Sequence, residues 1–249
     1  QKILYLCKKY WTMNFTHLHV HSHYSVLDGM SKVPDLIDKC LRTGMNAIAL
    51  TDHGNMYGAV TFFDACVSLD EEYYDRHGKP IVKPILGCEF YICDGDVIDD
   101  KSKKTMFHLV LLAKNQNGYH NLCKLDSFAT TQGYYYRPRI NHEILEKYKD
   151  DLICLSACIQ GEVARYILDG DKEEAIKRAQ YYKNLFGEDF YIELQDHGLQ
   201  EQKDSNPALM EIAELLNIKT VITNDSHYLR AQDAAWHDTL LCEQTKSSK

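Results

Sequence analysis

The densest chemistry in the sequence is a run of histidines near the amino terminus. His17, His19, His21 and His23 are four of the twelve histidines of the chain, and one residue separates each from the next. On an extended strand, alternate side chains project to the same side, so the run predicts a strand face made of imidazoles. A neutral imidazole is the commonest metal ligand in proteins, and Asp28 follows shortly after. We interpret the run as part of a metal site rather than as an exposed polar face.

Further groups that can bind metal recur beside predicted strands downstream. They are His53 in Thr51-Asp52-His53-Gly54, Glu89 in Gly87–Tyr91, His108 in Phe107–Leu111, Cys158 after Leu152–Ser156, and the pair Asp225 and His227 after Thr220–Thr223. A carboxylate inside an apolar strand, such as Glu89, requires a cation, a proton or several donors. Taken singly, Asp52 could cap a helix, His108 could be a satisfied core histidine, and Cys158 could be an inert buried thiol. Their recurrence at strands indicates a shared site.

Short apolar strands alternate with amphipathic helices along the chain. The predicted strands are residues 15–21, Ala47–Thr51, Ile81–Tyr91, Phe107–Leu112, Leu152–Ser156, Phe190–Leu194 and Thr220–Thr223. The predicted helices are Val33–Arg42, Val60–Leu69, Gly118–Phe128, Glu173–Phe186 and Pro207–Leu216. This alternation predicts an α/β fold with a parallel sheet, either closed as a barrel or open and doubly wound. Polar groups that follow several strands converge most naturally at the top of a barrel, which favours the closed form.

Composition restricts the class of protein. The formal net charge of −8 argues against a domain that grips DNA through a broad basic surface, although bound divalent cations would change the local sign. No apolar run approaches the roughly 20 residues that span a membrane. Nine cysteines without a C-x-x-C pair predict reduced thiols and a cytoplasmic location. We expect residues 1–12 to be an extension outside the fold, residues 13–245 to form one domain, and residues 246–249 to form a tail; the loop Ser68–Lys79 is charged and predicted to be solvated.

The ordered motifs resemble a known family. The strings are FTHLHVHSHYSVLDG, ALTDHGNMYGAV, KPILGCEFY, GYYYRPRI, TNDSHYL and AWHDTLLCEQT. They are similar to the polymerase and histidinol phosphatase (PHP) superfamily, and within it to the PHP domain that opens bacterial DNA polymerase III alpha subunits. The resemblance runs from about Asn14 to Thr245. It implies a distorted seven-stranded (β/α)7 TIM-like barrel with a trinuclear metal site at the carboxyl ends of the strands.

The resemblance also implies a distribution of ligands, with His19, His21, Glu89 and Asp225 as the catalytic set. The first metal would be bound by His19, His21, Glu89 and Asp225, the second by Glu89, His108 and Cys158, and the third by Asp28, His53 and His227. His17 and His23 are spare, and His23 could replace Asp28. The resemblance implies two to three divalent ions. The nitrogen and sulfur ligands favour zinc, manganese or iron over a site that binds magnesium alone.

One loop combines aromatic rings with guanidinium groups. Tyr135, Tyr136, Arg137 and Arg139 lie in Tyr134–Arg139, where they could stack bases and hold phosphates of a single DNA strand. The same loop could equally pack against the rest of a polymerase.

The activity implied by the resemblance is a metal-dependent phosphoesterase, acting as a 3′–5′ exonuclease that proofreads DNA ends within a DNA-directed DNA polymerase. The nucleotidyl-transfer carboxylates would lie in the part of such a protein that follows Lys249. Partners would be the 3′ end of DNA, the rest of the alpha subunit, and replisome subunits such as a separate exonuclease or sliding clamp, with no membrane partner. The alternatives are a catalytically silent scaffold that stabilises the polymerase or docks an exonuclease, and a free-standing PHP phosphatase.

Overall fold

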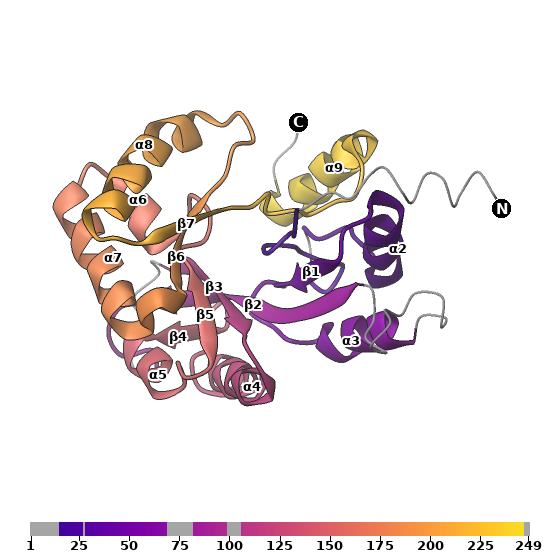
Figure 1. Ribbon diagram of the computed structural model, residues 1–249, viewed down its shortest axis with the longest axis horizontal. Helices are drawn as coiled ribbons and strands as arrows, with labels where there is room; N and C mark the ends of the chain where they lie inside the picture. Colours follow the sequence, from indigo (N-terminus) through magenta and orange to yellow (C-terminus); the bar gives the residue numbers. More distant parts are fainter. Residues whose placement is uncertain (1–14, 27, 69–81, 99–105, 247–249) are drawn as a thin grey trace. The chain divides into compact units, whose positions relative to one another are not determined.

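The computed structural model describes residues 15–26, 28–68, 82–98 and 106–246 (Figure 1). They fall into two compact units. The first unit comprises Gln1–Asp52, Tyr57–Leu86 and Ser226–Lys249, and the second comprises His53–Met56 and Gly87–Asp225. The expected extension at residues 1–12 lies outside the described residues. The same holds for the expected loop Ser68–Lys79 beyond Ser68 and for the expected tail beyond residue 246.

Among the described residues, the first unit contains three α-helices and a short parallel strand pair. Its elements are α2 (Val33–Thr43), β1 (Ala47–Leu50), α3 (Ala59–Val67), the start of β2 (Lys83–Cys93), the 3-10 turn η3 (Ala231–Asp233) and α9 (Ala234–Thr245). α2 forms because Val33, Leu36, Ile37 and Cys40 recur at helical spacing and are all buried. Gly44 ends the helix in a left-handed conformation with φ of 72°, which glycine adopts without steric cost.

The second unit contains the remaining strands and helices. They are β3 (Phe107–Ala113), α4 (Gln116–Thr131), β4 (Arg139–Asn141), α5 (His142–Lys147), β5 (Leu152–Leu155), α6 (Glu162–Leu168), α7 (Lys172–Phe186), η2 (Gly187–Asp189), β6 (Phe190–Leu194), α8 (Gln200–Leu215) and β7 (Lys219–Ile222). Helix α4 packs on β3, α7 packs on β5 and β6, and α8 packs on β6 and β7. These helices bury the apolar strand residues in one core, so the strands hold their polar residues at fixed places.

The expected direction of one central strand is wrong. β3 runs antiparallel to both of its neighbours, β2 and β5, whereas β2–β4, β5–β6 and β6–β7 are parallel. Leu109, Val110, Leu111 and Leu112 are all buried, which is the pattern of a strand covered on both faces. Such a run is typical of parallel sheets, but an apolar run carries no information about its direction.

The expected barrel is also not closed by the described strands. Pairing follows the order β1-β2-β3-β5-β6-β7, with β4 on β2, and no described pairing joins β1 to β7. Residues 15–21, expected as a strand, form only isolated parallel bridges, from His17 to Ile48 and from Val20 to Ser226. Regular pairing ends there because the backbone turns at once, where the Ser25 N–H donates to the Ser22 carbonyl at 2.9 Å.

The Tyr134–Arg139 loop places its two arginines in different surroundings. Arg139 is fully buried, and its guanidinium donates to the carbonyls of Gly133 and Val97, both at 2.9 Å. Its side chain therefore holds the loop and does not face solvent, which leaves Tyr135, Tyr136 and Arg137 as the predicted DNA contacts. Tyr136 is 71% exposed at the tip of a turn closed by the Tyr135 N–H and the Arg137 carbonyl.

We predict that Arg139→Met lowers the free energy of unfolding by about 3 kcal/mol, because two buried carbonyl oxygens lose their donor. Chemical denaturation of the full chain measures this difference. Arg137→Met is the control; it removes only a cation–π contact with Tyr91 and should cost less than about 1 kcal/mol. Equal losses in the two variants would contradict a structural role for Arg139.

Candidate metal centre

The second unit contains a buried carboxylate with two imidazoles beside it. Glu89 of β2 is 1% exposed, and its Oε1 lies 2.8 Å from Nδ1 of His108, while its Oε2 lies 2.5 Å from Nδ1 of His53. Cys158 Sγ lies 3.6 Å from the same His108 nitrogen. The geometry thus brings together four of the predicted ligands, and it groups His53 with Glu89 and His108. Nitrogen, oxygen and sulfur donors in one place suit a divalent transition metal.

Sheet register explains why Glu89 and His108 meet. β2 and β3 are antiparallel with Tyr91 opposite His108 and Glu89 opposite Val110, so the two ligands are offset by two residues across the ladder. Residues two apart on a strand share a face, and diagonal neighbours on that face lie within reach of long side chains. The paired strands β2 and β3 thereby fix the Glu89 and His108 side chains without help from a loop.

His53 reaches the cluster through a tight turn. The Gly54 N–H donates to the Glu89 carbonyl at 2.8 Å, and the Asn55 side chain donates to the His53 carbonyl at 2.9 Å. Gly54 has φ of 56°, and a Cβ there would lie 2.6 Å from the Pro138 ring. A glycine is therefore required at this position both for the backbone conformation and for space.

A carboxylate on α4 supports the same turn. Asp126 accepts a hydrogen bond from the backbone of Met56, and burial raises the pKa of its carboxyl to about 6, although this hydrogen bond and one from Thr130 oppose the rise. Ionised Asp126 is therefore disfavoured in the folded protein relative to the unfolded chain.

The Cys158 thiol lies in an environment that disfavours its charged form. Burial raises the pKa of this thiol well above the usual value, and the negative charges of Glu89 and Asp225 raise it further. Ala157, just before it, has φ of 62°, a conformation uncommon outside glycine. A site with several carboxylates and a protonated thiol lacks positive charge, which a divalent cation would supply.

The first unit holds four more of the nine predicted ligands, and the ninth, Asp225, belongs to the second unit. His19 and His21 are fully buried, Asp28 is 8% exposed, and the ring of His227 stacks on that of His21 at 4.2 Å. His23 is exposed because the chain turns after Ser22, whereas His19 is buried and His17 is partly buried. Burial thus favours Asp28 over His23 as a ligand.

Asp52 has a role that the sequence interpretation missed. Its buried carboxylate accepts hydrogen bonds from the Ser22 N–H at 2.7 Å and from the Ser25 hydroxyl at 2.8 Å. The Ser25 hydroxyl also contacts Nδ1 of His21 at 2.9 Å, so Asp52 fixes the orientation of a candidate ligand through one intervening serine. Partners of this kind orient metal ligands and increase their basicity.

His237 is a further residue that the predicted ligand set omitted. Its ring lies 5.7 Å from that of His227, and its buried Nε2 has no hydrogen-bond partner among the described residues. Burial and the neighbouring His227 lower the pKa of its imidazole, which favours the neutral form that binds metal. The sequence signal was weak, because His237 is one isolated histidine in the motif AWHDTLLCEQT.

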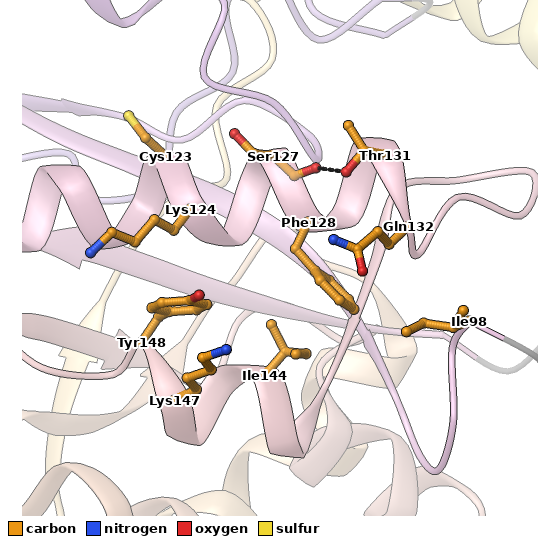
Figure 2. Close-up of a pocket in the computed structure, with 10 residues that line it drawn as sticks. All are labelled: Ile98, Cys123, Lys124, Ser127, Phe128, Thr131, Gln132, Ile144, Lys147 and Tyr148. Carbon is orange, nitrogen blue, oxygen red and sulfur yellow. Dashed lines mark hydrogen bonds between the residues drawn. The ribbon is translucent and has the colours of Figure 1, made fainter.

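A separate groove lies between α4 and α5 in the second unit. Figure 2 shows five of the residues that line it, Lys124, Phe128, Ile144, Lys147 and Tyr148. Its volume is about 510 Å³. None of the nine candidate metal ligands lines it. The groove is therefore not the metal centre.

Comparison with known proteins agrees with this chemistry. Residues 17–197 match the profile of the PHP domain. The chain belongs to the PHP domain family. It is 43% identical over 244 residues to DNA polymerase III subunit alpha of Deinococcus radiodurans, and 43% identical over 242 residues to that of Treponema pallidum. These matches cover 94% and 95% of this chain but 18% and 20% of the relatives, so the chain spans about a fifth of their length.

A solved structure shares the fold of this PHP chain. A protein of Bifidobacterium adolescentis, assigned to the metal-dependent phosphoesterases, matches with a TM-score of 0.50 at 16% identity, covering 86% of this chain and 87% of that one. The match of residues 17–197 to the PHP domain and the identity to polymerase alpha subunits confirm the predicted resemblance. Within the described residues, no helix is both long enough and apolar enough to cross a membrane.

We predict that Asp126→Asn changes how stability depends on pH. A carboxyl with a pKa raised from 3.8 to about 6 contributes stability below pH 4 and loses that contribution as the pH rises through 6. Relative to the wild-type chain, the variant should therefore gain about 1–2 kcal/mol between pH 4 and pH 7, a value reduced to allow for partial exposure. Urea denaturation at several pH values measures the difference, and a difference independent of pH would contradict the raised pKa.

Proposed function

We propose that this chain is the metal-dependent phosphoesterase module of a DNA polymerase III alpha subunit and removes nucleotides from the 3′ end of DNA. The observation that carries the proposal is the buried Glu89 carboxylate with His53, His108 and Cys158 around it. The similarity to polymerase alpha subunits supplies the substrate class, since those relatives are named as DNA polymerases. Residues 13–245 would form the PHP domain of a cytoplasmic replication protein, with the remainder of the alpha subunit and other replisome subunits as partners.

The donors of this chain fit divalent metal ions. In the second unit His53, Glu89, His108, Cys158 and Asp225 would hold metal, and in the first unit His19, His21, Asp28 and His227 would do so. We propose two to three ions, and the sulfur and nitrogen donors favour zinc, manganese or iron. When bound, such ions polarise phosphoryl oxygens and lower the pKa of bound water.

The protein side chains have distinct tasks in this proposal. Glu89 would offer both carboxylate oxygens to metal, because they face different imidazoles. His19 and His21 in the first unit, and Asp225 in the second, would each offer a ligand atom to metal. Tyr135, Tyr136 and Arg137 would guide a single strand by stacking and by charge, which requires the exposure that Tyr136 has. His53 and His108 must stay neutral to bind metal, so acid should disfavour the active state.

We predict that the full chain, purified without chelator, carries two to three transition-metal ions per molecule. His108→Ala should reduce that number by removing a donor from the Glu89 cluster, and it should cancel the rise in melting temperature that added metal gives the wild-type chain. Elemental analysis and thermal denaturation measure the two effects. His120→Ala is the matched control, since that histidine lies on α4 beside Tyr119 and belongs to no candidate cluster. A folded chain that takes up no metal on titration would refute the metal proposal.

We predict release of mononucleotides from the 3′ end of a single-stranded oligonucleotide when manganese or zinc is supplied. Asp225→Asn preserves shape but removes a charge, so it should lower the rate at least 100-fold while the melting temperature changes little. Arg137→Ala should weaken substrate binding and leave the maximal rate nearly unchanged. Oligonucleotides labelled at the 3′ or 5′ end give both the direction and the rate.

A trace activity that is unchanged in Asp225→Asn and in His19→Ala would belong to a contaminant. In that outcome, with metal still bound, the chain would be a scaffold whose metals serve the fold.

A further inference from the structure

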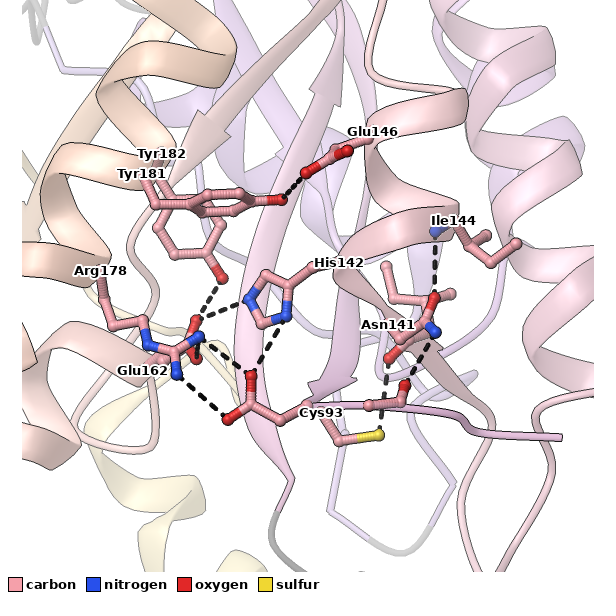
Figure 3. Close-up of polar contacts among 12 residues, drawn as sticks. Cys93, Asn141, His142, Ile144, Glu146, Glu162, Arg178, Tyr181 and Tyr182 are labelled. Carbon is pink, nitrogen blue, oxygen red and sulfur yellow. Dashed lines mark hydrogen bonds and ion pairs between the residues drawn. The ribbon is translucent and has the colours of Figure 1, made fainter. Parts of the chain in front are cut away.

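A second polar cluster in the second unit lies apart from the Glu89 centre. Figure 3 shows His142, Glu162, Arg178 and Tyr182 joined by hydrogen bonds and ion pairs. Asp94 belongs to the same cluster, since its Oδ1 lies 2.9 Å from Nη1 of Arg178 and 3.4 Å from Nδ1 of His142. They come from the end of β2, from the start of α5, from the start of α6, and from α7. Contacts that join the fully buried Glu162 to partly exposed partners therefore tie together four separate parts of the chain.

Glu162 is the member that all the helices share. Its side chain is fully buried. The carboxylate accepts a hydrogen bond from the Tyr182 hydroxyl at 2.6 Å and pairs with Nη1 of Arg178 and with Nε2 of His142, both at 3.2 Å. Although burial opposes it, the charges of Glu162 and Asp94 raise the pKa of Arg178, so its guanidinium stays charged. Burial and Glu162 likewise raise the pKa of Tyr182, which keeps its hydroxyl as a donor.

The cluster is not a metal site, even though Asp94, His142 and Glu162 could each offer a ligand atom. Arg178 Nη1 lies 2.9 Å from Asp94 and 3.2 Å from Glu162, so a permanent cation already occupies the space between the two carboxylates. A divalent ion there would be repelled by the guanidinium. The role of the cluster must instead lie in the segments of the chain that its contacts hold in place.

The segment that precedes Glu162 carries Cys158. Glu162 is the first residue of α6, and the loop before it closes on itself because the Gly161 N–H donates to the Cys158 carbonyl at 2.8 Å. The His108 N–H donates to the Gln160 carbonyl at 2.9 Å, so the loop also contacts the strand that bears another candidate ligand. At Gly161 a Cβ would lie 2.0 Å from the Ser156 carbonyl oxygen, so the closed loop has no space for a side chain at this position.

We propose that Glu162 is a positioning residue: by anchoring the start of α6 to His142, Arg178 and Tyr182, it holds Cys158 beside His108. Asp94 extends the same restraint to β2, the strand that carries Glu89. The inference concerns the protein without metal, and it rests on the proposed function only where Cys158 acts as a metal ligand.

The first test needs no metal. In Glu162→Gln the side chain keeps its size but loses the charge that pairs with Arg178, so the loop should open more often. Hydrogen–deuterium exchange of the full, metal-free chain should become at least 10-fold faster in the peptide that covers Ser156–Gly161. Tyr182→Phe, which removes one donor, should give a smaller increase. Leu125→Ala is the control, since it removes a buried side chain of α4 and should destabilise the chain without a selective effect on this loop.

The second test uses Co²⁺ as the probe. Wild-type chain should bind Co²⁺ with a sulfur-to-metal absorption band that Cys158→Ser abolishes. Glu162→Gln should weaken Co²⁺ binding by about 10- to 100-fold, the range found when residues that orient ligands are changed, and should reduce the band at equal occupancy. Leu125→Ala should keep both the affinity and the band.

The outcomes separate the two proposals. If the wild-type chain binds no Co²⁺, the metal proposal fails, and the exchange experiment alone decides the role of Glu162. If wild type shows the band but Glu162→Gln matches it in exchange, affinity and absorption, the positioning role is wrong while the metal proposal stands. If Leu125→Ala loses as much affinity as Glu162→Gln, general destabilisation explains the loss, and Glu162 has no positioning role.

Discussion

The second unit depends on the cost of keeping Glu89 in the core. A carboxylate that is 1% exposed cannot remain ionised without compensation, and this chain supplies two imidazoles at hydrogen-bond distance. Three parts of the unit bring groups to this carboxylate. β3 places His108 diagonally opposite Glu89, the Gly54 turn delivers His53, and the loop before α6 brings Cys158. Each element is positioned by packing, but the group that all of them face is a single buried charge.

Local sequence predicted the elements whose signals are strong. Val33, Leu36, Ile37 and Cys40 recur at helical spacing, and α2 begins and ends within one residue of its predicted bounds. β3 and β6 also lie where apolar runs placed them. β4 and α5 were missed because they are three and six residues long, too short for either period to be recognised. The direction of β3 and the open strand order are set by contacts between segments distant in sequence, which no local pattern contains.

For the candidate site too, the sequence predicted which residues take part but not how they are arranged. Residue chemistry and the family resemblance identified Glu89, His108 and Cys158, and the structure places them together. The sequence did not predict that His53 lies beside Glu89, because that placement depends on the turn at Gly54. For Asp52, taken singly, the sequence left a helix cap open as an alternative to a role in the site, since an Asp before a helix often has that role. Its actual partners, Ser22 and Ser25, are about 30 residues away in sequence, and only the fold brings them within hydrogen-bond distance.

The surroundings of Cys158 have a consequence for the durability of the protein. Oxidants attack the thiolate and hardly react with a protonated thiol. Because burial and the nearby Glu89 and Asp225 keep this thiol protonated, a newly made chain that has not yet met metal would resist conversion to sulfenic acid at this position. The carboxylates that attract a cation would thus also protect, until the cation arrives, the one sulfur in the candidate ligand set.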